Sequence, residues 1–190
     1  MELSVKAYLG LLLVVALLRI YELQISRRHQ REMISHGASR VMDPVFGPMV
    51  VLHTGVLLGA ALEVVFLHRP FYPVLAALCF AIFLAANIVR WWVIRTLGEH
   101  WNVEVMNSTS MGVITSGPFR YVRHPNYAAV FVEMLVLPLI HSAWITAAVG
   151  SAAHILVLSR RINTEERVLF SDARYREAMY GKPRFLPGLF

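Results

Sequence analysis

Long uninterrupted runs of apolar residues are the feature that most constrains how this chain can fold. An α-helix needs about 20 apolar residues to cross the hydrocarbon core of a bilayer. Three runs of about that length cover Ala7 to Ile25, Phe46 to Leu67 and Phe71 to Ile94. Hydrophobic residues make up 57% of the chain and charged residues only 16%, which argues against an ordinary soluble domain. The sequence therefore predicts an all-α polytopic membrane protein.

Two more apolar stretches follow in the second half, at residues 127–139 and 143–158, with Pro138 and an HSA turn between them. The first is short for a full crossing and is expected to form the tilted arm of a helical hairpin. We therefore expect about five transmembrane helices in a single domain covering residues 1–190. Residues 1–96 would form three N-terminal spans, and residues 97–190 a polar loop, the hairpin and a C-terminal tail.

Basic residues gather in the segments that follow the first run, the third run and the last run. Topology thus explains the net charge of +6, and nucleic acid is not expected as a partner. Because basic loops stay in the cytoplasm, we expect the N-terminus outside and the C-terminus in the cytoplasm. The single Cys79 can form no internal disulfide, and the eight histidines lack a paired-ligand spacing, so no metal site is predicted.

Several charged or amide side chains interrupt the apolar runs, where they are costly and usually face a partner or a cavity. Arg19 and Glu22 lie one helical turn apart, so they can form a pair. Glu133 shares a helix face with Asn126 and Val130, and we expect it to face a cavity.

Three other polar residues in the runs have a simpler explanation open to them. Glu63 and Arg90 lie near the ends of their runs, so their charged ends could extend to the membrane surface. Asn87 lies one turn before Arg90 and is a polar neighbour of it.

The stretch GPFRYVRHPNY, residues 117–127, places two arginines, a histidine and a Pro–Asn turn between apolar segments. Proline suits the first position of a helix, so a helix is expected to begin at Pro125. The free N–H groups and partial positive charge of such a helix start can receive a carboxylate. The alternative is a cytoplasmic loop whose arginines only set the topology.

The stretch RINTEERVLF, residues 161–170, follows the last apolar run. Asn163 and Glu166 have the spacing of a capping box, so this segment could simply begin a new helix. Both motifs, however, fall on the same predicted face of the membrane, each beside an arm of the hairpin. Together they offer cationic, anionic and aromatic groups, which suit a zwitterionic cofactor with an aromatic base.

These motifs, SGPFRYVRHPNY, RINTEERVLF and a tail from Tyr175 through Tyr180 to PRFLPG, resemble the isoprenylcysteine carboxyl methyltransferase family of integral membrane enzymes. The resemblance covers Leu97 to the end. It implies S-adenosyl-L-methionine as cofactor in a cytoplasmic pocket, a lipophilic small-molecule acceptor, and a location in the bacterial inner membrane among its lipids. In the N-terminal half, RIYELQISRRH, HGA and PMVVLH are similar to a bacterial subgroup that O-methylates alkylpyrones.

The resemblance also implies roles for individual residues. In the cofactor pocket, Glu165 and Glu166 would hold the amino group or the ribose hydroxyls, and Arg161 would order that face. The remaining residues expected to line or support this pocket are Tyr121, His124, Pro125 and Tyr127. On the acceptor side, where the chemistry of holding an anionic oxygen selects the candidates and not the resemblance, the expected catalytic residues are Arg123, Arg90 and Glu133, and the expected substrate contacts are Arg19 and Asn87.

Methyl transfer from a sulfonium mainly requires that two reactants be aligned and desolvated. A carboxylate or acidic enol arrives ionised, so an arginine-rich site without a strong general base suits an O-methyltransferase. Two alternatives stay open on the sequence alone. One is an NADPH-dependent membrane reductase related to the sterol reductases, and the other is a non-enzymatic transporter or scaffold.

Overall fold

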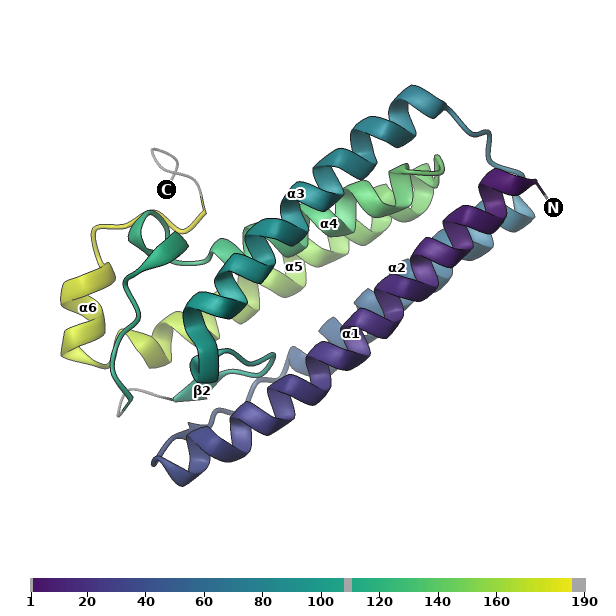
Figure 1. Ribbon diagram of the computed structural model, residues 1–190. Helices are drawn as coiled ribbons and strands as arrows, with labels where there is room; N and C mark the ends of the chain where they lie inside the picture. The colour runs from purple at the N-terminus through teal and green to yellow at the C-terminus, as the bar shows by residue number, and fades with distance from the viewer. Residues whose placement is uncertain (1, 108–110, 186–190) are drawn as a thin grey trace.

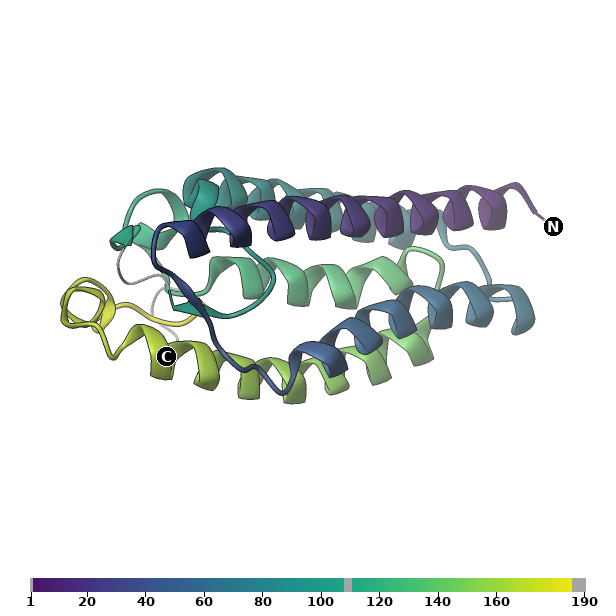
Figure 2. The same ribbon diagram turned by 90° about the horizontal axis from the view of Figure 1, so that it is seen from below.

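The computed structural model describes residues 2–107 and 111–185, and it shows long helices that run side by side (Figure 1). When the bundle is seen from below, α4 lies between a layer formed by α1 and α3 and a layer formed by α2 and α5 (Figure 2). The helices are α1 (Leu3–Ser35), α2 (Phe46–Phe66), α3 (Pro73–Leu97), α4 (Pro125–Leu139), α5 (Trp144–Leu169) and α6 (Ala173–Met179). The chain is thus nearly all-α, as predicted.

Within the described residues, four helices are long and apolar enough to cross a membrane, namely α1, α2, α3 with its short extension to His100, and α5. The fifth apolar helix, α4, has only 15 residues. At 1.5 Å per residue it measures about 22 Å, less than the hydrocarbon core of about 30 Å. The prediction of a short hairpin arm is therefore confirmed, and its neighbours bury most of α4.

Helix α1 extends ten residues beyond the apolar run that predicted it, from Ile25 to Ser35. Its extra turns pack on the connection between α3 and α4. The hydroxyl oxygen of Ser26 accepts a hydrogen bond from Val103 N at 2.9 Å, and Asn102 Nδ2 donates to Met33 Sδ at 3.6 Å. Tertiary contacts thus stabilise the last ten residues of α1, where the sequence is polar and basic.

Helix α5 also continues through a segment for which a break was an open alternative. The capping-box alternative at residues 163–166 is wrong, because Asn163 lies inside α5, which runs unbroken to Leu169. Arg161, Ile162 and Glu166 are buried there. Contacts with α4 and the connecting loops hold this polar end of the helix in place.

The proposed extension of Glu63 to the membrane surface is also wrong. Its carboxylate accepts hydrogen bonds from Ile145 N at 3.1 Å and Thr146 N at 2.7 Å, two unpaired groups in the first turn of α5. Arg69 Nε donates to the same carboxylate at 2.9 Å. Glu63 therefore fixes the start of α5 against the end of α2.

Short irregular elements lie in the connection between α3 and α4. One of them, the two-residue strand β2 (Met106–Asn107), pairs in antiparallel register with β1 (Ser39–Arg40) of the α1–α2 loop and so joins the two long loops. The 3-10 turn η3 (Gly117–Arg120) then approaches α3 closely. Gly117 has a φ of 57°, and a Cβ on it would lie 2.5 Å from Thr96 Oγ1, so only glycine allows this approach.

Candidate active site

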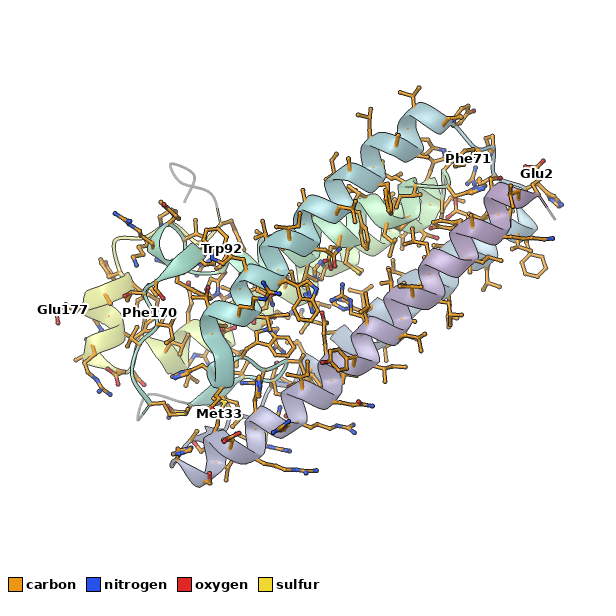
Figure 3. The ribbon with its side chains drawn as sticks, in the orientation of Figure 1. Glu2, Met33, Phe71, Trp92, Phe170 and Glu177 are labelled. Atoms are coloured by element: carbon orange, nitrogen blue, oxygen red, sulfur yellow. The ribbon has the colours of Figure 1, made fainter. Side chains whose placement is uncertain are left out.

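Polar side chains gather at the end of the bundle that carries α6, which we call the loop end. Phe170 and Glu177 mark this end in Figure 3, and Glu2 and Phe71 mark the opposite end. The loops, the described tail and the N-terminus of α4 all meet at the loop end. The start of α4 supplies His124, Asn126 and Tyr127 there, and the last turns of α5 supply Arg161, Glu165 and Glu166.

Glu166 on α5 binds three basic side chains, and we call Glu166, Arg123, His124 and Arg184 the Glu166 cluster. Oε1 accepts from Arg123 Nε at 2.9 Å and lies 3.0 Å from His124 Nε2. Oε2 accepts from Arg184 at 3.1 Å from Nε and 2.6 Å from Nη2. Two carboxylate oxygens thus hold together residues from the α4 start, from α5 and from the tail.

The tail is fixed across the start of α4 by main-chain hydrogen bonds. Arg123 N donates to Pro183 O and His124 N to Arg184 O, both at 2.9 Å. The Lys182 ammonium donates to Phe119 O at 2.7 Å, and burial lowers its pKa. These contacts leave Pro125 to begin α4, as the sequence predicted.

Arg161 is the centre of a second set of hydrogen bonds at the loop end, and it lies one turn before Glu165 on α5. Its Nε donates to the Tyr127 hydroxyl at 2.9 Å, and that hydroxyl donates in turn to Glu165. Its other nitrogens donate to Asp43 Oδ2 at 2.5 Å and to the carbonyl of Val103. Arg161 is only 3% exposed. Through these hydrogen bonds it joins α5 to α4 and to both long loops.

A separate cluster of charged side chains lies deeper, between the apolar helices. Arg19 Nη1 donates to both oxygens of Glu22, at 2.9 and 2.7 Å, and Nη2 donates to Glu133 Oε2 at 2.8 Å. Arg90 donates to Glu22 through Nε at 3.0 Å and through Nη2 at 2.6 Å. We call these four residues the buried ion network. The predicted Arg19–Glu22 pair is confirmed, and Arg90 is buried rather than extended to the surface.

The buried ion network borders a narrow cavity between α1, α2, α3 and α4. The cavity is mostly apolar, and the centre of a water molecule can reach about 40 Å³ of it. Its walls are formed by Val15, Arg19, His53, Val56, Leu57, Phe83, Arg90, Val130, Glu133, Met134 and Leu137. The expectation that Glu133 faces a cavity is therefore confirmed.

Two histidines that were not selected from the sequence lie beside this cavity. His53 on α2 lines the wall, and its ring centroid is 5.3 Å from that of His154 on α5. Phe131 stacks on His154 at 6.1 Å. A histidine eight residues into an apolar helix is the only signal that could have drawn attention to His53.

The structure separates some residues that were expected to act together. Arg123 lies in the Glu166 cluster at the loop end, away from the cavity that Arg90 lines. Asn87 Nδ2 donates to Phe83 O one turn back on its own helix, at 2.9 Å. The side chain of Tyr121 is 55% exposed and makes no hydrogen bond that would join it to the Glu166 cluster in the described residues.

Two residues that hold the site together were missed from the sequence. Arg184 completes the Glu166 cluster, and Asp43 pairs with Arg161 across 118 residues. Both lie beside prolines in otherwise polar segments, PRF and MDP, where a charge without an obvious partner was the available signal.

Comparison with known proteins agrees with this layout. The model of the isoprenylcysteine carboxyl methyltransferase (ICMT) family matches residues 77–171, which hold most of α3 and all of α4 and α5. The uncharacterized protein YpbQ of Bacillus subtilis is 26% identical over 159 residues, 84% of this chain and 94% of that protein. An uncharacterized protein of Haemophilus influenzae is 30% identical over 153 residues, 80% of this chain and 88% of that protein.

Neither relative's name specifies a substrate, so the narrower likeness to the alkylpyrone subgroup remains a prediction. The matched range contains the start of α4 and the polar end of α5, and α1 and α2 with Arg19, Glu22 and His53 lie outside it. The apolar helices fit an integral membrane protein. The chain belongs to the isoprenylcysteine carboxyl methyltransferase family, whose members are membrane methyltransferases that use S-adenosylmethionine.

Proposed function

We propose that this protein is an S-adenosylmethionine-dependent O-methyltransferase that acts on a lipophilic acceptor with an acidic oxygen. The observation that carries the proposal is the position of two different sites on one helix. The Glu166 cluster lies at the start of α4, and Glu133 borders the apolar cavity eight residues farther along it. Eight residues of helix rise about 12 Å, which is the scale of one cofactor molecule.

The residues at the loop end fit the proposed cofactor chemically. Guanidinium groups such as Arg123 and Arg184 can bind a carboxylate, and Glu165 can accept from an ammonium group or ribose hydroxyls. The rings of His124 and Tyr127, with centroids 5.3 Å apart, offer apolar faces to an adenine base. When bound, S-adenosylmethionine supplies an activated methyl group on a sulfonium.

One buried atom at this end supports the fit further. Oδ1 of Asn126, in the first turn of α4, is buried and has no hydrogen-bond partner among the described residues. Buried polar atoms nearly always have a partner, so an unpaired acceptor beside the cluster favours a ligand that brings a donor. An amino group is such a donor.

The cavity supports the second half of the proposal. Its apolar wall suits a hydrocarbon chain, and each buried CH₂ contributes about 0.8 kcal/mol to binding. Arg19 and Arg90 place guanidinium groups on the wall where the reacting oxygen would lie. Because α1 and α3 also face lipid, the acceptor would reach the cavity from the bilayer and the cofactor would reach the loop end from the cytoplasm.

Ligand-induced thermal stabilisation tests the cofactor. Protein purified in detergent should unfold at a higher temperature with S-adenosylhomocysteine and at an unchanged temperature with NADPH. Stabilisation by NADPH alone would favour the reductase alternative instead. Transfer of a labelled methyl group to alkylpyrones of increasing chain length, beside a prenylcysteine, then tests the acceptor. Activity should rise with chain length to the limit of the cavity, and equal rates with short, water-soluble acceptors would refute binding in the apolar cavity.

A further inference from the structure

The charges that border the cavity cancel one another. Arg19 and Arg90 carry two positive charges, and Glu22 and Glu133 carry two negative charges, all four linked by hydrogen bonds. An acceptor that entered as an anion would add a negative charge that neither arginine is free to balance in a dry interior, which is unfavourable. The charge balance therefore favours an acceptor that binds in its neutral form.

One oxygen of the buried ion network has no partner. Glu133 Oε2 accepts from Arg19, whereas Oε1 is buried and unpaired within the described part of the chain. An ionised carboxylate oxygen can only accept hydrogen bonds, so the group that satisfies it must be a donor. A neutral hydroxyl on the acceptor is such a donor, and a carboxylate is not.

We propose that Glu133 is the proton acceptor of the methyl transfer and that the acceptor enters the cavity as a neutral hydroxyl compound. This inference rests on the proposed function. The acceptor O–H bond breaks and its proton joins Oε1 of Glu133. The oxygen electron pair forms the new O–CH₃ bond as the S–CH₃ pair returns to sulfur. The sulfur loses its positive charge and Glu133 loses its negative charge, so the net charge of the site does not change.

The network also explains how the new oxyanion is held. Once Glu133 is protonated, Arg19 has lost one of its two anionic partners and can bind the oxygen that gave up the proton. Proton transfer thus moves a negative charge from Glu133 to the acceptor and leaves the total unchanged. The other titratable groups around Glu133 are Arg19 and Glu22 on α1, His53 on α2, Arg90 on α3, and His154 of α5 behind His53.

The pH dependence of ligand binding tests this assignment without any methyl transfer. The probe is a dodecyl nitrophenol, measured at and above the pH at which it ionises in the same detergent. Above that pH, wild-type affinity should fall about tenfold per pH unit, because the ionised probe must take up one proton when it forms the complex. Glu133→Gln makes the cavity one charge more positive, so its affinity should stay constant as the phenolate binds.

Two control variants make this binding experiment decisive. Glu32→Gln changes a carboxylate exposed on α1 and should behave like the wild type. His53→Asn should also keep the wild-type pH dependence. Loss of that dependence in His53→Asn with its retention in Glu133→Gln would overturn the proposal in favour of His53. A wild-type affinity that is independent of pH, or no binding of the probe at all, would overturn it as well.

Rates with two matched acceptors provide the second measurement. Glu133→Gln should lose about 100-fold or more of its activity toward a dodecylphenol, which reaches the enzyme with its proton. It should keep most of its activity toward the dodecyl nitrophenol, which is already ionised. An equal loss with both acceptors would mean that Glu133 is only structural. Failure of wild-type protein to bind S-adenosylhomocysteine would instead refute the proposed function, while the probe experiment would still decide how Glu133 behaves.

Discussion

Arg90 on α3 donates two hydrogen bonds to the carboxylate of Glu22 on α1, and this pair joins residues that are 68 positions apart in the chain. Both residues are almost completely buried, at 6% and 3% exposed. Breaking a buried ion pair from one side typically costs about 3–5 kcal/mol, because it leaves a charge without a partner. The two sides of this pair are not equivalent, since Glu22 also binds Arg19.

This asymmetry predicts the relative stability of two variants. Glu22→Leu leaves two guanidinium groups with a single carboxylate, whereas Arg90→Met leaves Glu22 still paired with Arg19. Glu22→Leu should therefore lower the free energy of unfolding by about 3 kcal/mol or more, and Arg90→Met by less. Thermal unfolding in detergent without ligand measures the difference, with the exposed Glu32→Leu as control. The reverse order would contradict the buried ion network.

The Glu166 cluster predicts a specific loss of cofactor affinity. Glu166→Gln keeps the shape of the side chain but removes the charge that holds Arg123, His124 and Arg184 in place. Affinity for S-adenosylhomocysteine should fall at least about tenfold, which corresponds to about 1.4 kcal/mol. Calorimetry on the purified protein measures it.

His124→Ala should also lower the affinity for S-adenosylhomocysteine, because it removes one of the side chains that Glu166 holds in place. The matched control for Glu166→Gln is Glu177→Gln, an exposed carboxylate on α6 (Figure 3). Wild-type affinity in both Glu166→Gln and His124→Ala would remove these residues from the cofactor site, and equal losses in Glu177→Gln would show that the effect is not specific.

Arg161 should not tolerate lysine. Its three guanidinium nitrogens point to Tyr127, Asp43 and the Val103 carbonyl, and a single ammonium group cannot reach all three. Arg161→Lys should destabilise the folded protein by about 2–3 kcal/mol, since a buried acceptor and the Asp43 carboxylate lose their donors. Arg160→Lys, on the exposed side of the same helix, should have little effect. Similar unfolding temperatures for both variants would be evidence against a structural role for Arg161.

The orientation in the membrane is a separate prediction. Arg27, Arg28 and Arg31 are exposed on the extended end of α1, on the same side as the Glu166 cluster. Because positively charged segments remain in the cytoplasm, reporters fused to the C-terminus should be active there and those at the N-terminus outside. A cytoplasmic N-terminus would contradict this orientation and with it the proposed route of the cofactor.

Local patterns predicted the helices well where chain chemistry alone decides them. The starts of α2 at Phe46 and α4 at Pro125 follow from an apolar run and from proline at the first helical position. The Arg19–Glu22 pair follows from spacing within one turn. In each case the partners lie close together in the chain, so no knowledge of the packing was required.

Contacts between distant segments could not be predicted in the same way. No periodicity relates Arg90 to Glu22, or Arg161 to Asp43, because these pairs form only after the helices assemble. The continuity of α5 through Asn163 had the same origin, since buried contacts overrode a local capping signal. The sequence motifs located the loop end correctly, but the tail residue that completes it, Arg184, emerged only from the folded chain.

The hydrogen bonds from Arg123 and His124 to residues 183 and 184 have a consequence for how this protein is made. The ribosome releases the α4 start some sixty residues before Arg184, and the helices can enter the bilayer during that interval. The Glu166 cluster, however, cannot close until Arg184 has itself been synthesised. We therefore expect a nascent chain to enter the membrane first and to complete the proposed cofactor site last, so a chain that stops short of the tail would reside in the membrane with the Glu166 cluster left open.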